Sequence, residues 1–198
     1  MSQVDAVGVT LLRAASDVLA ADGPGALTVR RIAHQAGVST MNVYSRFGGK
    51  DGVIDHLFIE GFRRLYEAVD RAPTTDDPLA DLRSCSANYR QFALANPTYY
   101  SIMFDRVVAD YVPSPAALEQ AGATLQQLAD RVARAMEMGA LAIDDPLTIA
   151  ASVWSTCHGL VSLELKEAKP PYIDWGHVFE LTTGALVRGL ASGARAPS

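Results

Sequence analysis

Residues 29–50 read VRRIAHQAGVSTMNVYSRFGGK, and this stretch decides the fold. It carries four Arg and Lys side chains and no Asp or Glu, although the 198-residue chain has a formal net charge of −5. Thr28 can cap one helix and Ser39 a second helix through Phe47, because Ser and Thr are favoured N-caps. Gly37 between them can supply the positive φ of a tight turn. The pattern predicts two short helices joined by a turn, which is a helix-turn-helix.

The second helix of this motif enters the DNA major groove with its N-terminal end first. The face of that helix left over after core packing carries polar or amphipathic side chains, namely Thr40, Met41, Asn42, Tyr44, Ser45 and Arg46. Asn can pair with adenine, and apolar atoms can contact a thymine methyl group. Asp or Glu would repel phosphates, which explains their absence. The alternative is an ordinary helical hairpin with a solvated basic face.

Charge and composition restrict the classes of protein to which the chain can belong. Residues 1–50 carry five Lys and Arg against three Asp, whereas residues 51–198 carry twelve against nineteen acidic side chains, so a polyanion would meet the N-terminal part first. Cys85 and Cys157 lie in no CxxC or Cys/His cluster, so we expect no metal, no cofactor and a reducing cytoplasm. The N-terminus lacks a signal-peptide pattern. Residues 146–163 are too polar for a membrane span, which favours a buried helix and no membrane partner.

The rest of the chain repeats apolar residues at spacings of three and four, and no run alternates as a strand would. Gly and Pro separate the repeats. The sequence therefore predicts an all-α protein of about nine helices. They are expected at residues 4–19, 28–36, 39–47, 50–71, 79–95, 97–109, 115–138, 146–168 and 175–191.

Residues 27–58, LTVRRIAHQAGVSTMNVYSRFGGKDGVIDHLF, closely resemble the N-terminal domain of TetR-type bacterial transcriptional regulators. The matching positions are Thr28, Arg30, Ile32, Ala33, Ala36, Gly37, Val38, Ser39, Tyr44, Phe47 and Lys50. The resemblance implies a three-helix DNA-binding head in which Tyr44 and Lys50 contact phosphates and Thr28 caps the second helix near the DNA backbone. Arg30 and Ser39 join the candidate DNA-binding residues. Met41, Arg46 and Gly49 depart from the family pattern, so the operator sequence cannot be carried over.

A shorter segment, SVWSTCHGLVSLEL at residues 152–165, resembles one subgroup of the family through Trp154, His158 and Gly159. The resemblance implies that residues 72–198 bind a small molecule and form a homodimer through the last two helices. Residues 1–50 would be the DNA-binding domain, linked by the helix at residues 50–71.

The helix at residues 146–168 is apolar on two faces and must bury both. The expected interface residues are Ile149, Val153, Cys157 and Leu160 on this helix, and Val178, Leu181, Thr182, Ala185 and Leu186 on the last one. The alternative is that both faces are buried within one protomer.

Aromatic and Met side chains could line a ligand pocket, because such linings suit an apolar or aromatic molecule. The candidates are Phe92, Tyr99, Tyr100, Met103, Phe104, Met136, Trp154 and His158. Plain core packing is the alternative reading of the same side chains.

The function expected from these patterns is a ligand-responsive transcriptional regulator. It would be a repressor released from a near-palindromic operator by a small apolar molecule, with activation as the alternative. An all-α enzyme is disfavoured, because the four His are scattered and no acidic pair or Ser/Cys–His spacing stands out. A module that binds only protein is disfavoured by the carboxylate-free stretch.

Overall fold

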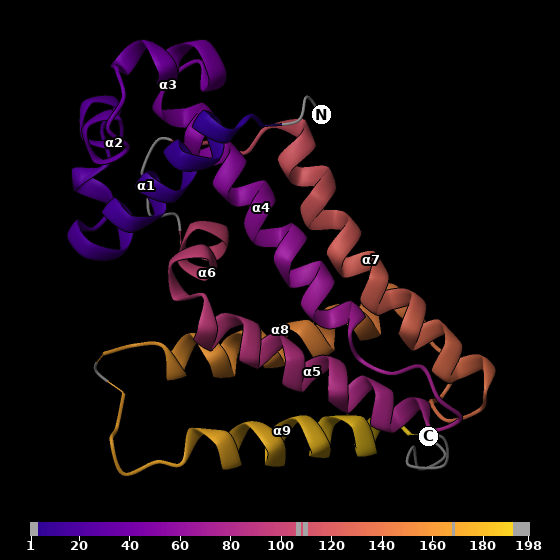
Figure 1. The fold of residues 1–198 in the computed structure, drawn as a ribbon. Coiled ribbons are helices and arrows are strands. Elements are labelled where there is room, and N and C mark those ends of the chain that lie inside the picture. The colour runs from indigo at the N-terminus through magenta and orange to yellow at the C-terminus, as the bar shows by residue number, and fades with distance from the viewer. Residues whose placement is uncertain (1–3, 106–107, 109–110, 168, 192–198) are drawn as a thin grey trace. The chain divides into compact units, whose positions relative to one another are not determined.

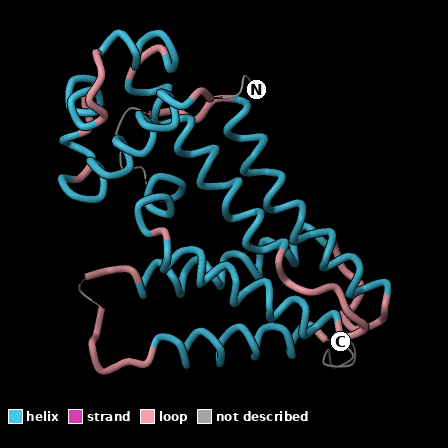
Figure 2. Tube along the Cα trace, viewed as in Figure 1, coloured by secondary structure: helices cyan, strands magenta, loops and turns pink. Residues whose placement is uncertain are grey.

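The computed structural model describes residues 4–105, 108, 111–167 and 169–191 (Figure 1). Within these residues the chain forms nine α-helices and no strand, which confirms the all-α class (Figure 2). The elements are α1 (Ala6–Asp22), the 3₁₀ turn η1 (Pro24–Ala26), α2 (Val29–Gln35), α3 (Thr40–Phe47), α4 (Lys50–Asp70), α5 (Pro78–Ala95), α6 (Pro97–Phe104), α7 (Pro115–Glu137), α8 (Pro146–Glu164) and α9 (Trp175–Leu190).

Helix starts follow from local sequence. Asp5, Thr28, Asp145 and Asp174 each accept a hydrogen bond from the backbone N–H three residues further on, as N-caps do. Helices α5, α6, α7 and α8 each begin with Pro, whose missing N–H is not needed in the first turn. The first helix therefore starts after Asp5, not at Val4 as the apolar pattern suggested.

Two expected helices are too long at their C-terminal ends. Helix α6 ends at Phe104, because Asp105 leaves the helical conformation after bonding back to Ser101; part of the expected extension lies outside the described residues. Helix α8 ends at Glu164, and the Lys166 N–H then bonds to Leu163 in a tighter turn. Apolar residues continue past both ends in the sequence, so their spacing alone predicted helices that were too long.

The chain divides into two compact units. Unit 1 consists of Met1–Phe62 and Asn96–Gln120, and unit 2 consists of Arg63–Ala95 and Ala121–Ser198. The division falls inside α4 and α7, so each of these helices contributes residues to both units. Compared with the expected domains, unit 1 also includes α6 and the start of α7.

In unit 1 the helices α1, α2 and α3 pack around buried apolar side chains, which include Leu11, Ala15, Val18, Leu27, Ile32, Val43 and Phe47. Helix α6 packs closely on α4, because a Cβ added at Gly61 would lie 2.7 Å from the Met103 Sδ. Asp55 on α4 accepts hydrogen bonds from Tyr111 and Ser114, which precede α7.

In unit 2 the helices α8 and α9 lie side by side, and α5 packs against both (Figure 1). One buried cluster joins α5, α7 and α8 through Leu82, Ala129, Val132, Ala135, Met136, Leu141, Ile149 and Ala150. Arg90 on α5 donates two hydrogen bonds, of 2.8 and 2.6 Å, to the carboxylate of Glu164 on α8. The same guanidinium lies 5.7 Å from the ring centroid of Phe179 on α9. One cation thus connects three helices.

Candidate nucleic-acid interface

The turn between α2 and α3 is fixed by a side-chain cap and a glycine. Thr28 Oγ1 accepts from the Arg31 backbone N–H at 3.2 Å, as expected for the cap of α2. Gly37 follows with a φ of 66°, in the region that glycine adopts without strain. The Val38 N–H then bonds back to the Ala33 carbonyl at 3.0 Å. These contacts form the predicted helix-turn-helix.

Ser39 is the N-cap of α3 by position, as predicted, but its side chain does not act as a cap. It occupies the N-cap position, with φ −76° and ψ 155°, but its side chain makes no capping hydrogen bond to the backbone. Its hydroxyl accepts instead from the side-chain Nδ2 of Asn42 at 3.1 Å. The predicted N-cap position and the end of the helix at Phe47 are therefore confirmed, and only the capping hydrogen bond of the Ser39 side chain is missing.

Helix α3 leads directly into α4 through Gly48 and Gly49, whose φ angles are 73° and 144°. Gly52, in the first turn of α4, lies against the end of α3. A Cβ added there would lie only 1.8 Å from the carbonyl oxygen of Phe47. The close approach places Lys50 at the N-terminus of α4, where the helix dipole and backbone N–H groups favour an anion.

The outer face of α3 is open to solvent. Met41 is 69% and Tyr44 55% exposed, and Thr40 and Ser45 are exposed as well. The Tyr44 ring lies beside the backbone that leads into α4, since a Cβ added at Gly49 would lie 3.9 Å from its Cε1. An exposed face with large amphipathic side chains suits contact with DNA bases and phosphates.

The remaining candidate DNA-binding residues lie before and after α3 in the sequence. Thr28 and Arg30 are exposed and Lys50 is half-buried. The neighbouring Arg31 pairs with Asp22 at the end of α1, with 2.8 Å between Nη2 and Oδ2. The assigned phosphate contacts stay predictions.

Arg46 has protein partners in this structure, and its contact with DNA stays a prediction. Its Nε and Nη2 donate to the two carboxylate oxygens of Asp5 at 2.8 and 2.7 Å. Its Nη1 donates to Asn42 Oδ1 at 2.8 Å. Hydrogen bonds from Arg46 and from the Gly8 backbone N–H lower the pKa of Asp5 to about 2. Sequence reasoning missed Asp5 because it lies 41 positions from Arg46, outside the basic stretch.

The ligand candidates of α6 pack inside unit 1. Tyr100 and Met103 are buried, and Tyr99 and Phe104 are half-buried. The Phe104 ring centroid lies 4.9 Å from that of Tyr100 and 5.5 Å from that of Phe62. Core packing accounts for these contacts, and ligand binding by this group stays a prediction.

The ligand candidates of unit 2 divide into two kinds. Phe92 and Met136 are buried, and Met136 belongs to the apolar core cluster. Trp154 and His158 are half-buried, with ring centroids 5.8 Å apart. The His158 Nδ1 lies 3.3 Å from the Tyr89 hydroxyl. The last two candidates combine an aromatic surface with a polar group, as a ligand site requires.

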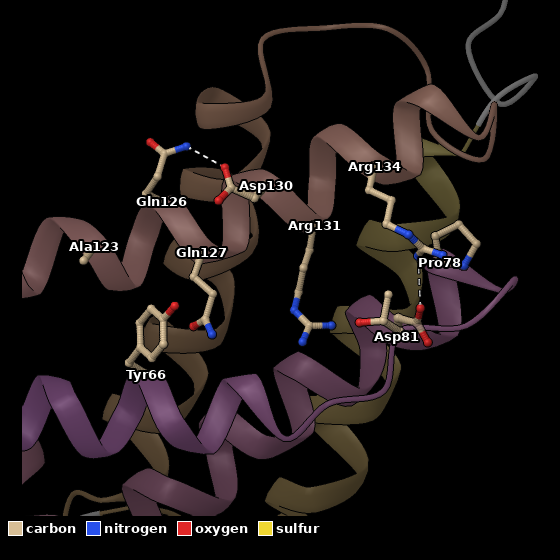
Figure 3. A pocket seen from close by; sticks show the side chains of 10 residues that line it. Tyr66, Pro78, Asp81, Ala123, Gln126, Gln127, Asp130, Arg131 and Arg134 are labelled. Atoms are coloured by element: carbon tan, nitrogen blue, oxygen red, sulfur yellow. Dashed lines mark hydrogen bonds and ion pairs between the residues drawn. The ribbon is translucent and has the colours of Figure 1, made fainter.

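A pocket of about 450 Å³ opens in unit 2 between the end of α4, the start of α5, and α7 (Figure 3). Its lining includes none of the eight ligand candidates; it consists of Tyr66, Thr74, Pro78, Asp81, Ala123, Gln126, Gln127, Asp130, Arg131 and Arg134. Arg131 donates to the backbone carbonyls of Ala72 and Pro73, and Arg134 to that of Thr75. The two arginines of the pocket therefore stabilise the α4–α5 connection.

The interface expected on α8 needs a correction. Ile149, Val153 and Cys157 are buried within the protomer, so this face of α8 is core and cannot face a partner. Burial raises the pKa of the Cys157 thiol to about 11. The sequence could not choose between the two apolar faces of α8, because that choice depends on how α5 and α7 pack. The other candidates remain accessible: Leu160, Val178, Thr182 and Leu186 are half-buried, and Leu181 and Ala185 are exposed.

None of the helices in the described ranges is both long and apolar enough to cross a membrane.

The chain matches two family models. Residues 11–57 match the model described as bacterial regulatory proteins, tetR family, and residues 82–186 match the tetracyclin repressor-like C-terminal domain. No curated protein matches the chain.

Several solved structures are similar along nearly the whole chain. A protein of unknown function from Rhodococcus sp. RHA1 is 25% identical with a TM-score of 0.83, covering 96% of this chain and 98% of that one. The TetR family transcriptional regulator PfmR from Thermus thermophilus is 19% identical with a TM-score of 0.71, covering 91% and 98%. The fatty acid degradation regulator FadR from Bacillus halodurans is 18% identical with a TM-score of 0.75, covering 96% and 98%. The similarity to PfmR and FadR shows a shared fold only.

Proposed function

We propose, from the fact that the chain belongs to the TetR family of bacterial transcriptional regulators, that it is a ligand-responsive repressor of transcription. Members of this family are regulators with a DNA-binding N-terminal domain, and they are not enzymes. The observation that carries the proposal is the outer face of α3, the second helix of the helix-turn-helix, where Met41 and Tyr44 are exposed.

The operator is proposed to be a near-palindrome read by a homodimer. One helix-turn-helix contacts few phosphates, whereas two placed about 34–36 Å apart, or a multiple of that distance, read two half-sites. The accessible side chains of α9, led by Leu181 at 58% exposure, support a partner on this surface. The exposed Leu147 and Leu163 on α8 extend the same argument.

The inducer is proposed to be a small, largely apolar or aromatic molecule. The half-buried pair of Trp154 and His158 supports it, since the indole offers a flat apolar surface and the imidazole one hydrogen bond. Such a molecule releases DNA only by binding one conformation of the dimer better than another. Because α4 contributes residues to both units, it is the proposed lever. The place of action is the cytoplasm, where the bacterial chromosome lies.

The test is selection of bound DNA from a random-sequence library by the full-length protein, followed by protection mapping at two salt concentrations. We expect a protected near-palindrome and an affinity that falls steeply with salt, because phosphate contacts release counterions. Enrichment of no sequence would refute operator recognition.

The dimer is tested separately by analytical ultracentrifugation. Leu181→Glu should shift the protein to monomers, because a charge would enter the proposed apolar contact. Leu118→Glu is the matched control, since Leu118 is also 58% exposed but lies on α7. Equal behaviour of the two variants would place the interface elsewhere.

A further inference from the structure

One side-chain network ties the recognition helix to the start of the chain. The Gly8 N–H and Arg46 donate to Asp5, Arg46 Nη1 donates to Asn42 Oδ1, and Asn42 Nδ2 donates to the Ser39 hydroxyl. Asn42 and Arg46 are one helical turn apart on α3, and Asp5 caps α1. The network thus joins two side chains of the proposed base-reading set to a carboxylate from another helix.

The network determines which way the Asn42 amide points. Its oxygen is held by Arg46 at 2.8 Å and its nitrogen by Ser39 at 3.1 Å, so exchanging the two would place donor against donor. A side-chain amide has two N–H groups and two acceptor sites, so one of each remains open. These are the groups that a bidentate contact with adenine requires.

The same network also holds the guanidinium group of Arg46 against a carboxylate. A guanidinium without a carboxylate partner at this position would bind any phosphate, which adds affinity for every DNA sequence and selectivity for none. Asp5 holds two of its three nitrogens. The third donates to Asn42 Oδ1 at 2.8 Å and to the Ser45 hydroxyl at 3.4 Å. Arg46 therefore orients a neighbouring side chain instead of acting as a general phosphate ligand.

We propose that Asp5 is a positioning residue that sets the base selectivity of α3 by holding Arg46 on Asn42. This inference rests on the proposed operator recognition. Asp5 touches no base; it acts through Arg46, which orients the Asn42 amide for one base pair in each half-site.

The test repeats the random-library selection with full-length variants. Asp5→Asn removes the charge but keeps a good N-cap for α1, so the fold should survive. We expect its preference at one base pair per half-site to fall about tenfold. Asn42→Ala should lose preference at the same base pair. Combining the two substitutions should lose no more than Asn42→Ala alone.

Asp22→Asn is the matched control. It removes the same charge from the same unit and frees Arg31 on α2, but it leaves Asn42 untouched. Both charge variants should bind scrambled DNA more tightly than the wild type, with a salt slope steeper by about one. Only Asp5→Asn should lose the base preference.

Arg46→Gln provides a second route that does not depend on the cap of α1. It should lose the same base preference without the gain on scrambled DNA. The proposal is overturned if Asp5→Asn keeps the preference that Asn42→Ala loses, or if Asp22→Asn loses it equally. A wild type that enriches no sequence overturns the proposed function and this inference together, whereas an enriched wild type with an unaffected Asp5→Asn overturns the inference alone.

Discussion

The helix-turn-helix of unit 1 and the helical bundle of unit 2 fix their chain turns by different means. In the helix-turn-helix the direction changes at Gly37, and at its end it changes again at Gly48 and Gly49, all with positive φ. Unit 2 also has a glycine with positive φ, Gly139 between α7 and α8, but its connections at residues 71–77 and 165–174 are longer. Local backbone freedom is thus enough for the short turns of the first region, whereas the connection at residues 71–77 uses contacts from a distant helix.

Side chains from distant helices supply these contacts in unit 2. Arg131 on α7 donates to the carbonyl oxygens of Asp70, Ala72 and Pro73, which lie 58 to 61 positions earlier. The last carbonyl groups of a helix accept no hydrogen bond within it, and at the end of α4 the guanidinium from α7 supplies the donor. The difference teaches that the backbone turns of the helix-turn-helix are set by nearby residues, and the α4–α5 connection of the bundle by its assembled helices.

The largest expected effect comes from closing the space that glycine leaves in unit 1. In Gly52→Ala the new Cβ would meet the Phe47 carbonyl at 1.8 Å, and a backbone carbonyl cannot move aside cheaply. We expect a loss of about 4 kcal/mol or more in unfolding free energy, together with loss of DNA binding. Urea unfolding followed by circular dichroism measures the loss of stability.

Gly122→Ala on α7 is the control for that substitution. A Cβ at Gly122 would meet nothing within 4 Å, so the variant should be about 0.5–1 kcal/mol more stable, because Ala favours a helix interior. If both variants unfolded alike, the close contact between α3 and α4 would not be what requires glycine at position 52.

The contrast between local and long-range contacts also explains which features could be predicted from the sequence. Caps such as Thr28 and Asp145 act over three residues, and Pro opens four helices, so most helix starts could be predicted. The buried face of α8 could not, because its two apolar faces look alike until α5 and α7 select one. The Asp5–Arg46 pair was missed for a similar reason, since charge counts ignore partners that only folding brings together.

The second largest effect is expected in unit 2. Arg90→Ala removes the partner of Glu164, whose side chain is only 10% exposed. We expect a loss of about 3 kcal/mol, because a buried carboxylate is left without a cation. Thermal unfolding measures it, and Arg31→Ala is the control, since the Arg31–Asp22 pair is exposed and should contribute less than about 0.5 kcal/mol. Equal losses would mean that unit 2 does not depend on its long-range ion pair.

The ligand site shows the limit of composition as a guide. Aromatic and Met side chains predicted a pocket, but Tyr100, Met103 and Met136 are buried by packing within their own units. The pocket in Figure 3 is instead lined by other residues, and Arg131 and Arg134 among them already donate to backbone carbonyls of the α4–α5 connection. Residue type alone does not separate a ligand lining from core, because both bury the same side chains.

A smaller effect should appear in DNA binding without any change in stability. Tyr44→Ala removes an exposed ring from the outer face of α3, so binding to all DNA sequences should weaken about tenfold while the fold persists. Fluorescence anisotropy with specific and scrambled DNA measures it. Tyr172→Ala is the control, because Tyr172 is 86% exposed but lies before α9 in unit 2. An unchanged affinity of Tyr44→Ala would contradict the assigned phosphate contact.

The smallest expected effect concerns Asp55, a polar anchor of unit 1 that the sequence did not reveal. Its carboxylate accepts from the Tyr111 hydroxyl at 2.8 Å, the Ser114 backbone N–H at 2.8 Å and the Ser114 hydroxyl at 2.6 Å. Burial raises the pKa of Asp55, but hydrogen bonds from Ser114 and Tyr111 outweigh it, so the pKa lies below its ordinary value. Asp55→Asn should cost about 1 kcal/mol at pH 7, because the amide cannot accept all three bonds.

The sign of the pH dependence follows from the lowered pKa. The stabilisation is complete above the unfolded pKa of about 4 and is lost as the pH falls through the lower folded value. The difference in unfolding free energy between the wild type and Asp55→Asn should therefore shrink as the pH falls below about 5. Urea unfolding across the range measures it, with Asp17→Asn on the exposed side of α1 as a control that should show little difference at either pH. A difference for Asp55→Asn that persists in acid would mean that a neutral Asp55 anchors Tyr111 and Ser114 equally well, which would make this anchor a matter of shape instead of charge.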